Sequence, residues 1–191
     1  MSCALGFRVK SGWAAVVLLA GPKSAPCVLD SRVIELSDPG VSDSRQPYHA
    51  GFGTAQTNVA KVNRLVRGIE RFSRATIKTL LADYRREHRI RGAGIVVPSL
   101  TDPETIASPH MRAHANEGRL FRTVVADAAQ HCHLPAAVVL ERAVYERLGR
   151  ALRRPALEVK GRVTELGEGV SRWRAEQKVA AAAAWLVLAG A

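Results

Sequence analysis

The chain is 191 residues long, which is enough for one domain with a proper hydrophobic core. Hydrophobic residues at 47% and charged residues at 24% are ordinary for a globular protein, while aromatic residues at 5% weaken any case for extensive base stacking. Lysines and arginines number 28 against 17 acidic residues, and this net charge of +11 favours a polyanionic partner. The alternative is that arginine simply supplies charge to solvated helix surfaces.

The cysteines exclude two classes of small protein. Cys3, Cys27 and Cys132 are widely separated and form no Cys-x-x-Cys pair, which argues against a disulfide framework and against a zinc ribbon. No apolar run reaches the roughly 20 residues that a membrane helix needs. The segment 8–20 imitates a short signal peptide, but the prolines that follow it do not suit a cleavage site. We therefore expect a cytoplasmic protein without a membrane segment.

The N-terminal part predicts three consecutive strands and a long loop. Apolar and β-branched runs favour strands over residues 3–9, 13–20 and 27–36. The segment 37–54 is rich in proline and glycine and predicts an irregular loop. Since the three strands follow one another directly, we expect them to pair as antiparallel hairpins.

The rest of the chain alternates between helices and strands. Helices are predicted over residues 57–88, 108–131, 143–153 and 174–188, and strands over residues 94–98 and 136–141. Residues 154–172 are expected to form the connection to the last helix. The order β-β-β-α-β-α-β-α-α predicts a single α/β domain over residues 1–191, in which helices flank a mixed five-stranded sheet.

Three separated segments carry a family resemblance. Residues 5–9 lead through a tight turn into a second strand, residues 134–142 form a Leu-Pro-led strand that ends in Glu-Arg, and residues 177–181 open the last helix. In this order they resemble the Holliday-junction resolvases of the ribonuclease-H-like superfamily. The matching segments of that family are Gly-x-Asp-x-Gly, a strand ending in Asp-Glu-Arg, and Asp-Lys-x-Ala-Ala. The resemblance implies a ribonuclease-H-like sheet and a nuclease centre of acidic residues.

The acidic positions of that family fall on Arg8, Leu140 and Gln177 in this chain. An arginine repels the Mg²⁺ ions that such nucleases need, and neither of the other two side chains supplies a carboxylate. Glu141 and Glu176 lie one position away. Because one step along a strand turns a side chain to the opposite face, Glu141 is expected to point away from the site. The resemblance therefore predicts a catalytically degenerate relative, in which Glu141 is one remaining catalytic candidate.

A second candidate site lies on the predicted helix 108–131. His110, His114 and Glu117 occupy positions i, i+4 and i+7, which places all three side chains on one helix face. Two histidines and a carboxylate on one face predict a divalent-metal site, with Glu117 as a further catalytic candidate. The alternative is a polar helix start in which Glu117 hydrogen-bonds a histidine or a neighbouring arginine.

The predicted helix 57–88 carries a continuous row of cations opposite its apolar face. The row consists of Lys61, Arg64, Arg67, Arg71, Arg74 and Lys78, and it is extended by Arg85, Arg86 and Arg89. Each cation can neutralise one phosphate, so the row predicts salt-dependent binding of DNA or RNA. The alternative is a solvated helix surface.

The sequence thus predicts a catalytically degenerate ribonuclease-H-like protein that binds nucleic acid. One alternative is a metal-dependent nuclease or hydrolase whose site has moved to the histidines. Another is a protein-interaction module that binds protein partners or forms a homo-oligomer. A phosphate-binding Gly-x-x-x-x-Gly-Lys loop and a Gly-x-Ser-x-Gly elbow are both absent from the sequence, which argues against nucleotide hydrolysis and serine-hydrolase chemistry.

Overall fold

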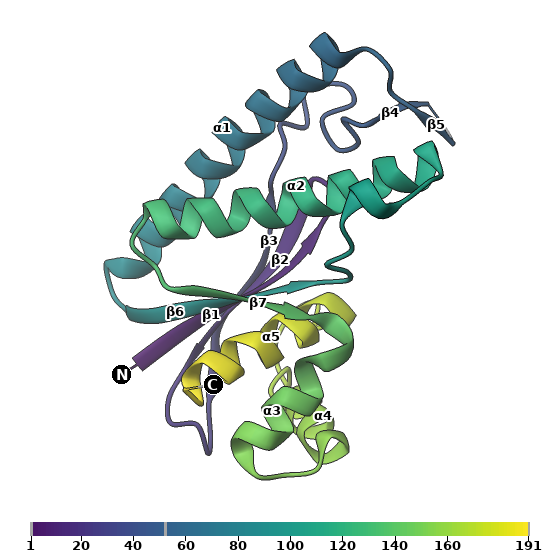
Figure 1. Cartoon of the computed structure of the whole chain (residues 1–191). Helices are drawn as coiled ribbons and strands as arrows, with labels where there is room; N and C mark the ends of the chain where they lie inside the picture. Colours follow the sequence, from purple (N-terminus) through teal and green to yellow (C-terminus); the bar gives the residue numbers. More distant parts are fainter. Residues whose placement is uncertain (1, 52, 191) are drawn as a thin grey trace.

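The computed structural model describes residues 2–51 and 53–190 and is built on a five-stranded mixed sheet of order β3-β2-β1-β6-β7 (Figure 1). The strands are β1 (Ser2–Lys10), β2 (Trp13–Ala20), β3 (Cys27–Glu35), β6 (Arg89–Val97) and β7 (Ala136–Leu140). The first three pair antiparallel, whereas β6 and β7 run parallel to β1. This confirms the predicted mixed sheet.

Helices cover both faces of the sheet (Figure 1). One face carries α1 (Val59–Arg85) and α2 (Pro109–His131), and the other carries α3 (Val144–Leu152), α4 (Ala156–Glu165) and α5 (Ala175–Leu188). Two short 3₁₀ turns, η1 (Pro103–Thr105) and η2 (Glu141–Ala143), follow β6 and β7. Across residues 2–51 and 53–190, no helix is both long and apolar enough to cross a bilayer.

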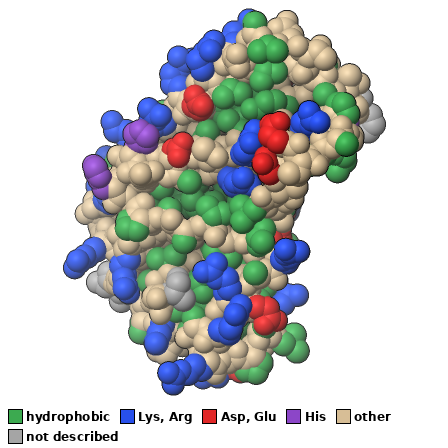
Figure 2. Space-filling view, in the orientation of Figure 1, with side chains coloured by type: hydrophobic (Ala, Val, Ile, Leu, Met, Phe, Trp, Pro, Cys, Tyr) green, Lys and Arg blue, Asp and Glu red, His purple; other side chains and the backbone are tan. Residues whose placement is uncertain are grey.

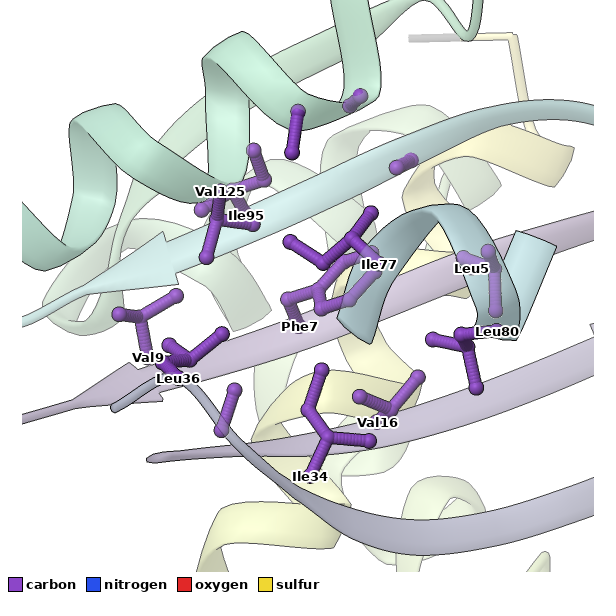
Figure 3. Close-up of a cluster of buried hydrophobic side chains, with 14 of the residues drawn as sticks. Leu5, Phe7, Val9, Val16, Ile34, Leu36, Ile77, Leu80, Ile95 and Val125 are labelled. Carbon is purple, nitrogen blue, oxygen red and sulfur yellow. The ribbon is translucent and has the colours of Figure 1, made fainter. Parts of the chain in front are cut away.

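The central strands are apolar on both sides because helices cover both sides. Leu5, Phe7 and Val9 of β1 face α1 and α2, where they pack with Ile77 and Ile95 (Figure 3). On the other face the contact with α5 is very close. A Cβ placed on Gly6 would lie 1.7 Å from the carbonyl oxygen of Ala180, so only glycine lets helix and strand approach this far.

Helix α1 is held by its N-cap and by one buried hydroxyl. The Asn58 side chain accepts a hydrogen bond from the Lys61 amide at 2.9 Å, which satisfies one free donor of the first turn. Further along, the buried Ser73 hydroxyl donates to the Leu36 carbonyl at 2.5 Å. Together with the apolar face, these contacts fix the helix over the sheet and leave its opposite face in solvent.

The structure adds a β-hairpin and a helix to the segments that the sequence predicted as irregular. The loop 37–54 contains β4 (His49–Gly51), which pairs with β5 (Thr54–Ala55) in a small hairpin. The connection 154–172 contains helix α4, whose Val159 and Val163 are fully buried. Both are hard to recognise in the sequence. Helix α4 contains a glycine, and the strands β4 and β5 are only three and two residues long.

Candidate functional site

The position of the first family acid is occupied by a buried ion pair. Arg8 lies on β1 with only 3% of its surface exposed. Its Nη2 donates to Oε2 of Glu141 at 2.5 Å, and its Nη1 donates to the carbonyl of Val9 at 2.6 Å. The guanidinium is therefore engaged within the protein, where charge-assisted hydrogen bonds are strong.

The prediction that Glu141 points away from this site is wrong. Arg8 pairs with Val96 of β6, and Val96 pairs with Val139 of β7, so these three side chains share the face under α5. Leu140 lies on the opposite face, against the core under α1 and α2. Glu141, the first residue of η2 directly after β7, lies on the Arg8 face, where its carboxylate contacts the guanidinium. The sheet register, and not the motif alignment, decides which residue meets Arg8.

The remaining acid near this site is also opposed by a cation. Lys10, two residues after Arg8, lies 4.0 Å from the carboxylate of Glu176 at the start of α5. The next residue, Gln177, is buried, and its side-chain oxygen accepts a hydrogen bond from the Arg174 amide at 3.2 Å. Arg8 and Lys10 thus neutralise the negative charges of Glu141 and Glu176. A site in which cations already pair with the carboxylates does not fit a pair of Mg²⁺ ions.

The second candidate site, which we call the histidine cluster, consists of His49, His110, His114 and Glu117. Ser108 caps the N-terminus of α2, where its hydroxyl accepts a hydrogen bond from the Met111 amide at 3.4 Å. The first three turns of the helix carry the other three residues of the cluster. His49 comes from β4 and packs against them. Its ring centroid lies 4.4 Å from that of His114 and 5.3 Å from that of His110.

Glu117 is buried to 1% exposure within this cluster and makes its closest contact with His49. Oε1 of Glu117 lies 2.7 Å from Nδ1 of His49, and its Oε2 lies 3.9 Å from Nδ1 of His114. Burial raises the pKa of Glu117, and the hydrogen bond to His49 opposes that rise. Burial, and then electrostatic interaction with the neighbouring His49 and His110, lowers the pKa of His114.

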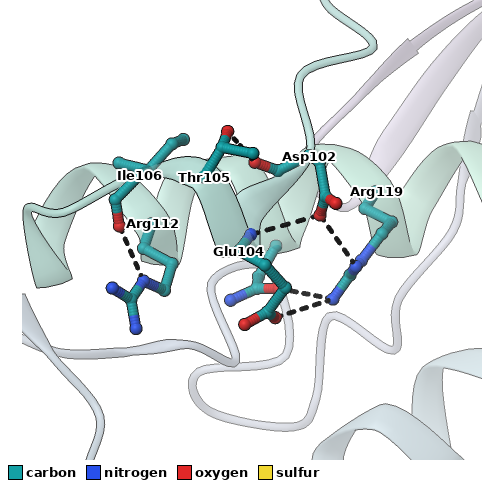
Figure 4. A network of polar contacts seen from close by, with 7 residues as sticks. Asp102, Glu104, Thr105, Ile106, Arg112 and Arg119 are labelled. Carbon is teal, nitrogen blue, oxygen red and sulfur yellow. Dashed lines mark hydrogen bonds and ion pairs between the residues drawn. The ribbon is translucent and has the colours of Figure 1, made fainter.

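A polar network anchors the start of α2 to the preceding segment (Figure 4). Arg119 reaches back to the carboxylates of Asp102 and Glu104, at 3.6 and 3.8 Å. Two turns earlier on the helix, Arg112 donates to the carbonyl of Ile106 at 2.8 Å. These contacts tie η1 and its flanking residues to the helix, and so they fix the helix turns that present the histidines.

His49 also lines a cavity of about 740 Å³ between the loop 37–51 and the β1–β2 turn. The other polar side chains in its wall are Ser11, Ser42, Asp43, Ser44, Arg45 and Gln46. His49 is the member of the histidine cluster that contributes to the wall of this cavity.

The third candidate site is the row of cations on α1. We call Arg64, Arg67, Arg71, Arg74 and Lys78 the cationic face; all five are exposed, and none of their side chains has an ion pair or hydrogen bond to another described residue. Figure 2 shows blue side chains along the edge of the molecule that α1 forms in Figure 1. Four of them, all except Arg64, line one groove of about 490 Å³.

The other predicted cations differ in their partners. Lys61 lies 2.7 Å from the carboxylate of Asp43, and Arg85 donates to the carbonyl of Cys132 at 2.8 Å. Arg86 lies 3.7 Å from Asp83, whereas Arg89 is exposed at the start of β6. The free charge is therefore concentrated on the middle turns of α1.

The structure brings His110, His114 and Glu117 together on α2 and adds His49, which sequence reasoning missed. A single histidine within a loop has no spacing that marks it as a ligand. Its only signal is its chemical type, and that signal is too weak without knowledge of where the loop lies.

Two solved structures of RuvC from Thermus thermophilus superpose on almost the whole chain. The complex of RuvC with a Holliday junction substrate has a TM-score of 0.57 and 14% identity, and the likeness covers 97% of this chain and 92% of that chain. A second RuvC structure has a TM-score of 0.54 and 13% identity, with 96% and 92% covered. The fold is ribonuclease-H-like.

This result confirms the ribonuclease-H-like fold that the sequence resemblance predicted. Neither the protein-family models nor the curated proteins contain a match to the chain. At 14% identity the likeness to RuvC establishes the architecture alone, since one fold supports many functions. Function must therefore be argued from the residues at the sites described above.

Proposed function

We propose that this ribonuclease-H-like protein binds nucleic acid through the cationic face of α1 and does not cleave it at the position of Arg8. The observation that carries the proposal is the set of five exposed, unpaired cations on successive turns of one helix. From Arg64 to Lys78 these turns extend about 21 Å along the helix, which matches about six base-pair steps of duplex DNA.

The physical basis of the binding is the release of counterions from phosphates. A helix whose cations served only to solvate its surface would be stabilised by acidic residues three or four positions from each cation. Yet Glu70 is the only acid between Arg64 and Lys78. The uncompensated charge raises the local potential and attracts a polyanion. The likeness to a RuvC that is bound to a Holliday junction makes four-way junction DNA the first ligand to test.

The absence of cleavage is supported by the ion pair of Arg8 with Glu141. Phosphodiester hydrolysis by divalent cations needs carboxylates that are free to bind them. Here the carboxylate at this end of β7 binds a guanidinium, and the neighbouring Gln177 and Leu140 carry no charge. We therefore expect bound DNA to remain intact in the presence of Mg²⁺ or Mn²⁺.

The binding half of the proposal is tested by fluorescence anisotropy with four-way junction, duplex and single-stranded DNA across a salt series. Five phosphate contacts predict a slope of about −4.5 in log affinity against log salt, or about a 500-fold loss between 50 and 200 mM salt. The variant Arg67→Glu/Arg71→Glu/Arg74→Glu should abolish most of the binding and flatten the slope that remains.

A matched control separates this face from the net charge of the protein. The variant Arg142→Glu/Arg147→Glu/Arg150→Glu makes the same change in charge at exposed positions on and just before α3, on the other side of the sheet. It should lose only a small part of the affinity. Equal losses in the two variants would show that binding is not located on α1, and no binding at low salt would refute the proposal.

The cleavage half is tested by incubating a labelled four-way junction with the protein and each divalent cation. Intact DNA is the expected result. Cleavage by the wild type that disappears in Glu141→Gln would show that Glu141 acts in a metal centre despite its contact with Arg8.

A further inference from the structure

The histidine cluster brings together three imidazoles from two distant parts of the chain. His110 and His114 lie one turn apart on α2, and the β4–β5 hairpin places His49 beside them. One nitrogen from each of the three rings can be chosen so that all three lie within 4.8 Å of one another. Three imidazole nitrogens at this separation form a recognised set of ligands for a transition-metal ion.

One pair of these nitrogens already has the spacing of a tetrahedral site. Zinc–nitrogen bonds of about 2.0–2.1 Å place two ligand nitrogens about 3.3 Å apart. Nε2 of His110 and Nε2 of His114 are already 3.1 Å apart. The chosen nitrogens of the three rings lie within 4.8 Å of one another, so a tetrahedral site needs them to approach by up to about 1.5 Å, and rotation of the exposed His114 side chain is one movement in that direction.

The fourth member of the cluster, Glu117, orients a ligand instead of competing for the metal. Its Oε1 lies 2.7 Å from Nδ1 of the buried His49; an ionised Glu117 accepts a hydrogen bond from Nδ1–H, and this tautomer of His49 leaves the lone pair on Nε2. That Nε2 is buried and has no hydrogen-bond partner among the described residues. An unpaired polar atom in a buried position is unfavourable unless something binds it.

We propose that His49, His110 and His114 bind a single Zn²⁺ ion, with Glu117 as the hydrogen-bond acceptor that holds His49 in its ligand orientation. Three neutral imidazoles favour zinc over Mg²⁺ or Ca²⁺, which take oxygen ligands. The site is distinct from the Arg8 position and from the cationic face, and it does not depend on nucleic-acid binding.

Three protein ligands leave one tetrahedral position for a water molecule or an anion. His49 also lines a cavity of about 740 Å³, whose wall includes Arg45 in its ion pair with Glu35 at 3.0 Å. The proposed centre is therefore a three-histidine site with a fourth position for water or a small anion.

The experiment uses the full chain purified without a histidine tag and stripped of metal with a chelator. Co²⁺ is added first, because tetrahedral Co²⁺ gives strong visible absorption, and Zn²⁺ affinity is then measured by competition with a chromogenic chelator. We expect one ion per chain, a tetrahedral Co²⁺ spectrum that Zn²⁺ removes, and a higher Tm with Zn²⁺ than without it.

The variants test each role separately. His114→Ala replaces a 47% exposed side chain, so the fold should be kept while Zn²⁺ affinity falls by more than about 100-fold; His49→Ala should have the same effect. Glu117→Gln should weaken binding by about 10–100-fold and retain the Co²⁺ spectrum. His88→Ala, which changes a histidine outside the cluster, should bind as the wild type does.

Two results would overturn the proposal. One is the absence of one-to-one binding of Co²⁺ or Zn²⁺ by the metal-free protein. The other is unchanged affinity in His114→Ala when circular dichroism shows that this variant is folded. The variant Arg67→Glu/Arg71→Glu/Arg74→Glu should keep its Zn²⁺ affinity, so failure of the metal site and failure of nucleic-acid binding are told apart.

Discussion

Truncating Glu141 should destabilise the protein more than removing the arginine that it contacts. Glu141→Ala leaves the guanidinium of Arg8, which is 3% exposed, without its carboxylate. Breaking a fully buried pair in this way costs about 3–5 kcal/mol. Because the Glu141 side chain is 41% exposed, water can reach the vacated position, and we expect about 2 kcal/mol. For a chain of this size that lowers Tm by about 4–8 °C.

Replacing the arginine has a different consequence. Arg8→Met removes the buried charge, fills the space with an apolar side chain, and leaves Glu141 in contact with solvent. The main loss is the hydrogen bond to the carbonyl of Val9, at about 1 kcal/mol. In the Arg8→Met background, Glu141→Ala should therefore cost less than about 0.5 kcal/mol, because no buried charge remains to be stranded.

Urea denaturation of the wild type, both single variants and the double variant measures these differences as a double-mutant cycle. The expected coupling between the two positions is about 1.5–2 kcal/mol, with an unchanged dependence of the unfolding free energy on urea. If Glu141→Ala costs the same with and without the arginine, the ion pair is not what stabilises this end of the sheet, and the reasoning fails.

Two further predictions concern the core and its tyrosine. Gly6→Ala should lower the unfolding free energy by more than about 3 kcal/mol, or prevent folding, because the new Cβ meets the Ala180 carbonyl oxygen. On α1, by contrast, the new Cβ of Gly68→Ala meets no atom within 4 Å, so this variant should stabilise the helix by up to about 1 kcal/mol. Thermal unfolding of the two variants gives the comparison, and a Gly6→Ala protein as stable as the wild type would contradict the close packing. Burial, followed by the hydrogen bond and charge of Asp30, raises the pKa of Tyr84 above its ordinary value, so the folded state favours the neutral phenol. This stabilisation is complete below the unfolded pKa of about 10 and is lost as the pH rises above it. The wild type should therefore exceed Tyr84→Phe in unfolding free energy by a margin that shrinks between about pH 9 and 11.5, as measured by urea denaturation. An advantage that stays constant over this range would show that the phenol has an ordinary pKa.

Much of the fold could be predicted from patterns that act over a few residues. The apolar runs of β1 and β2 and the helical spacing of α1 and α2 depend only on neighbours along the chain, so their positions agree with the structure to within a few residues. Helix α4 was missed because it is short and contains a glycine, and it is stabilised by burying Val159 and Val163. Its burial is a property of the packed protein and not of the segment.

The candidate sites divide in the same way. The helical repeat was sufficient to predict the cationic row on α1. It was equally sufficient to place His110, His114 and Glu117 on one face of α2. The contact of Arg8 with Glu141 joins residues that are 133 positions apart, and that of His49 with Glu117 joins residues 68 positions apart. Sheet register decides the first contact and the path of a loop decides the second. The sequence by itself therefore determined the chemical types available and their local faces, while only tertiary structure decided which side chains meet, because contacts between distant segments depend on how the whole chain packs.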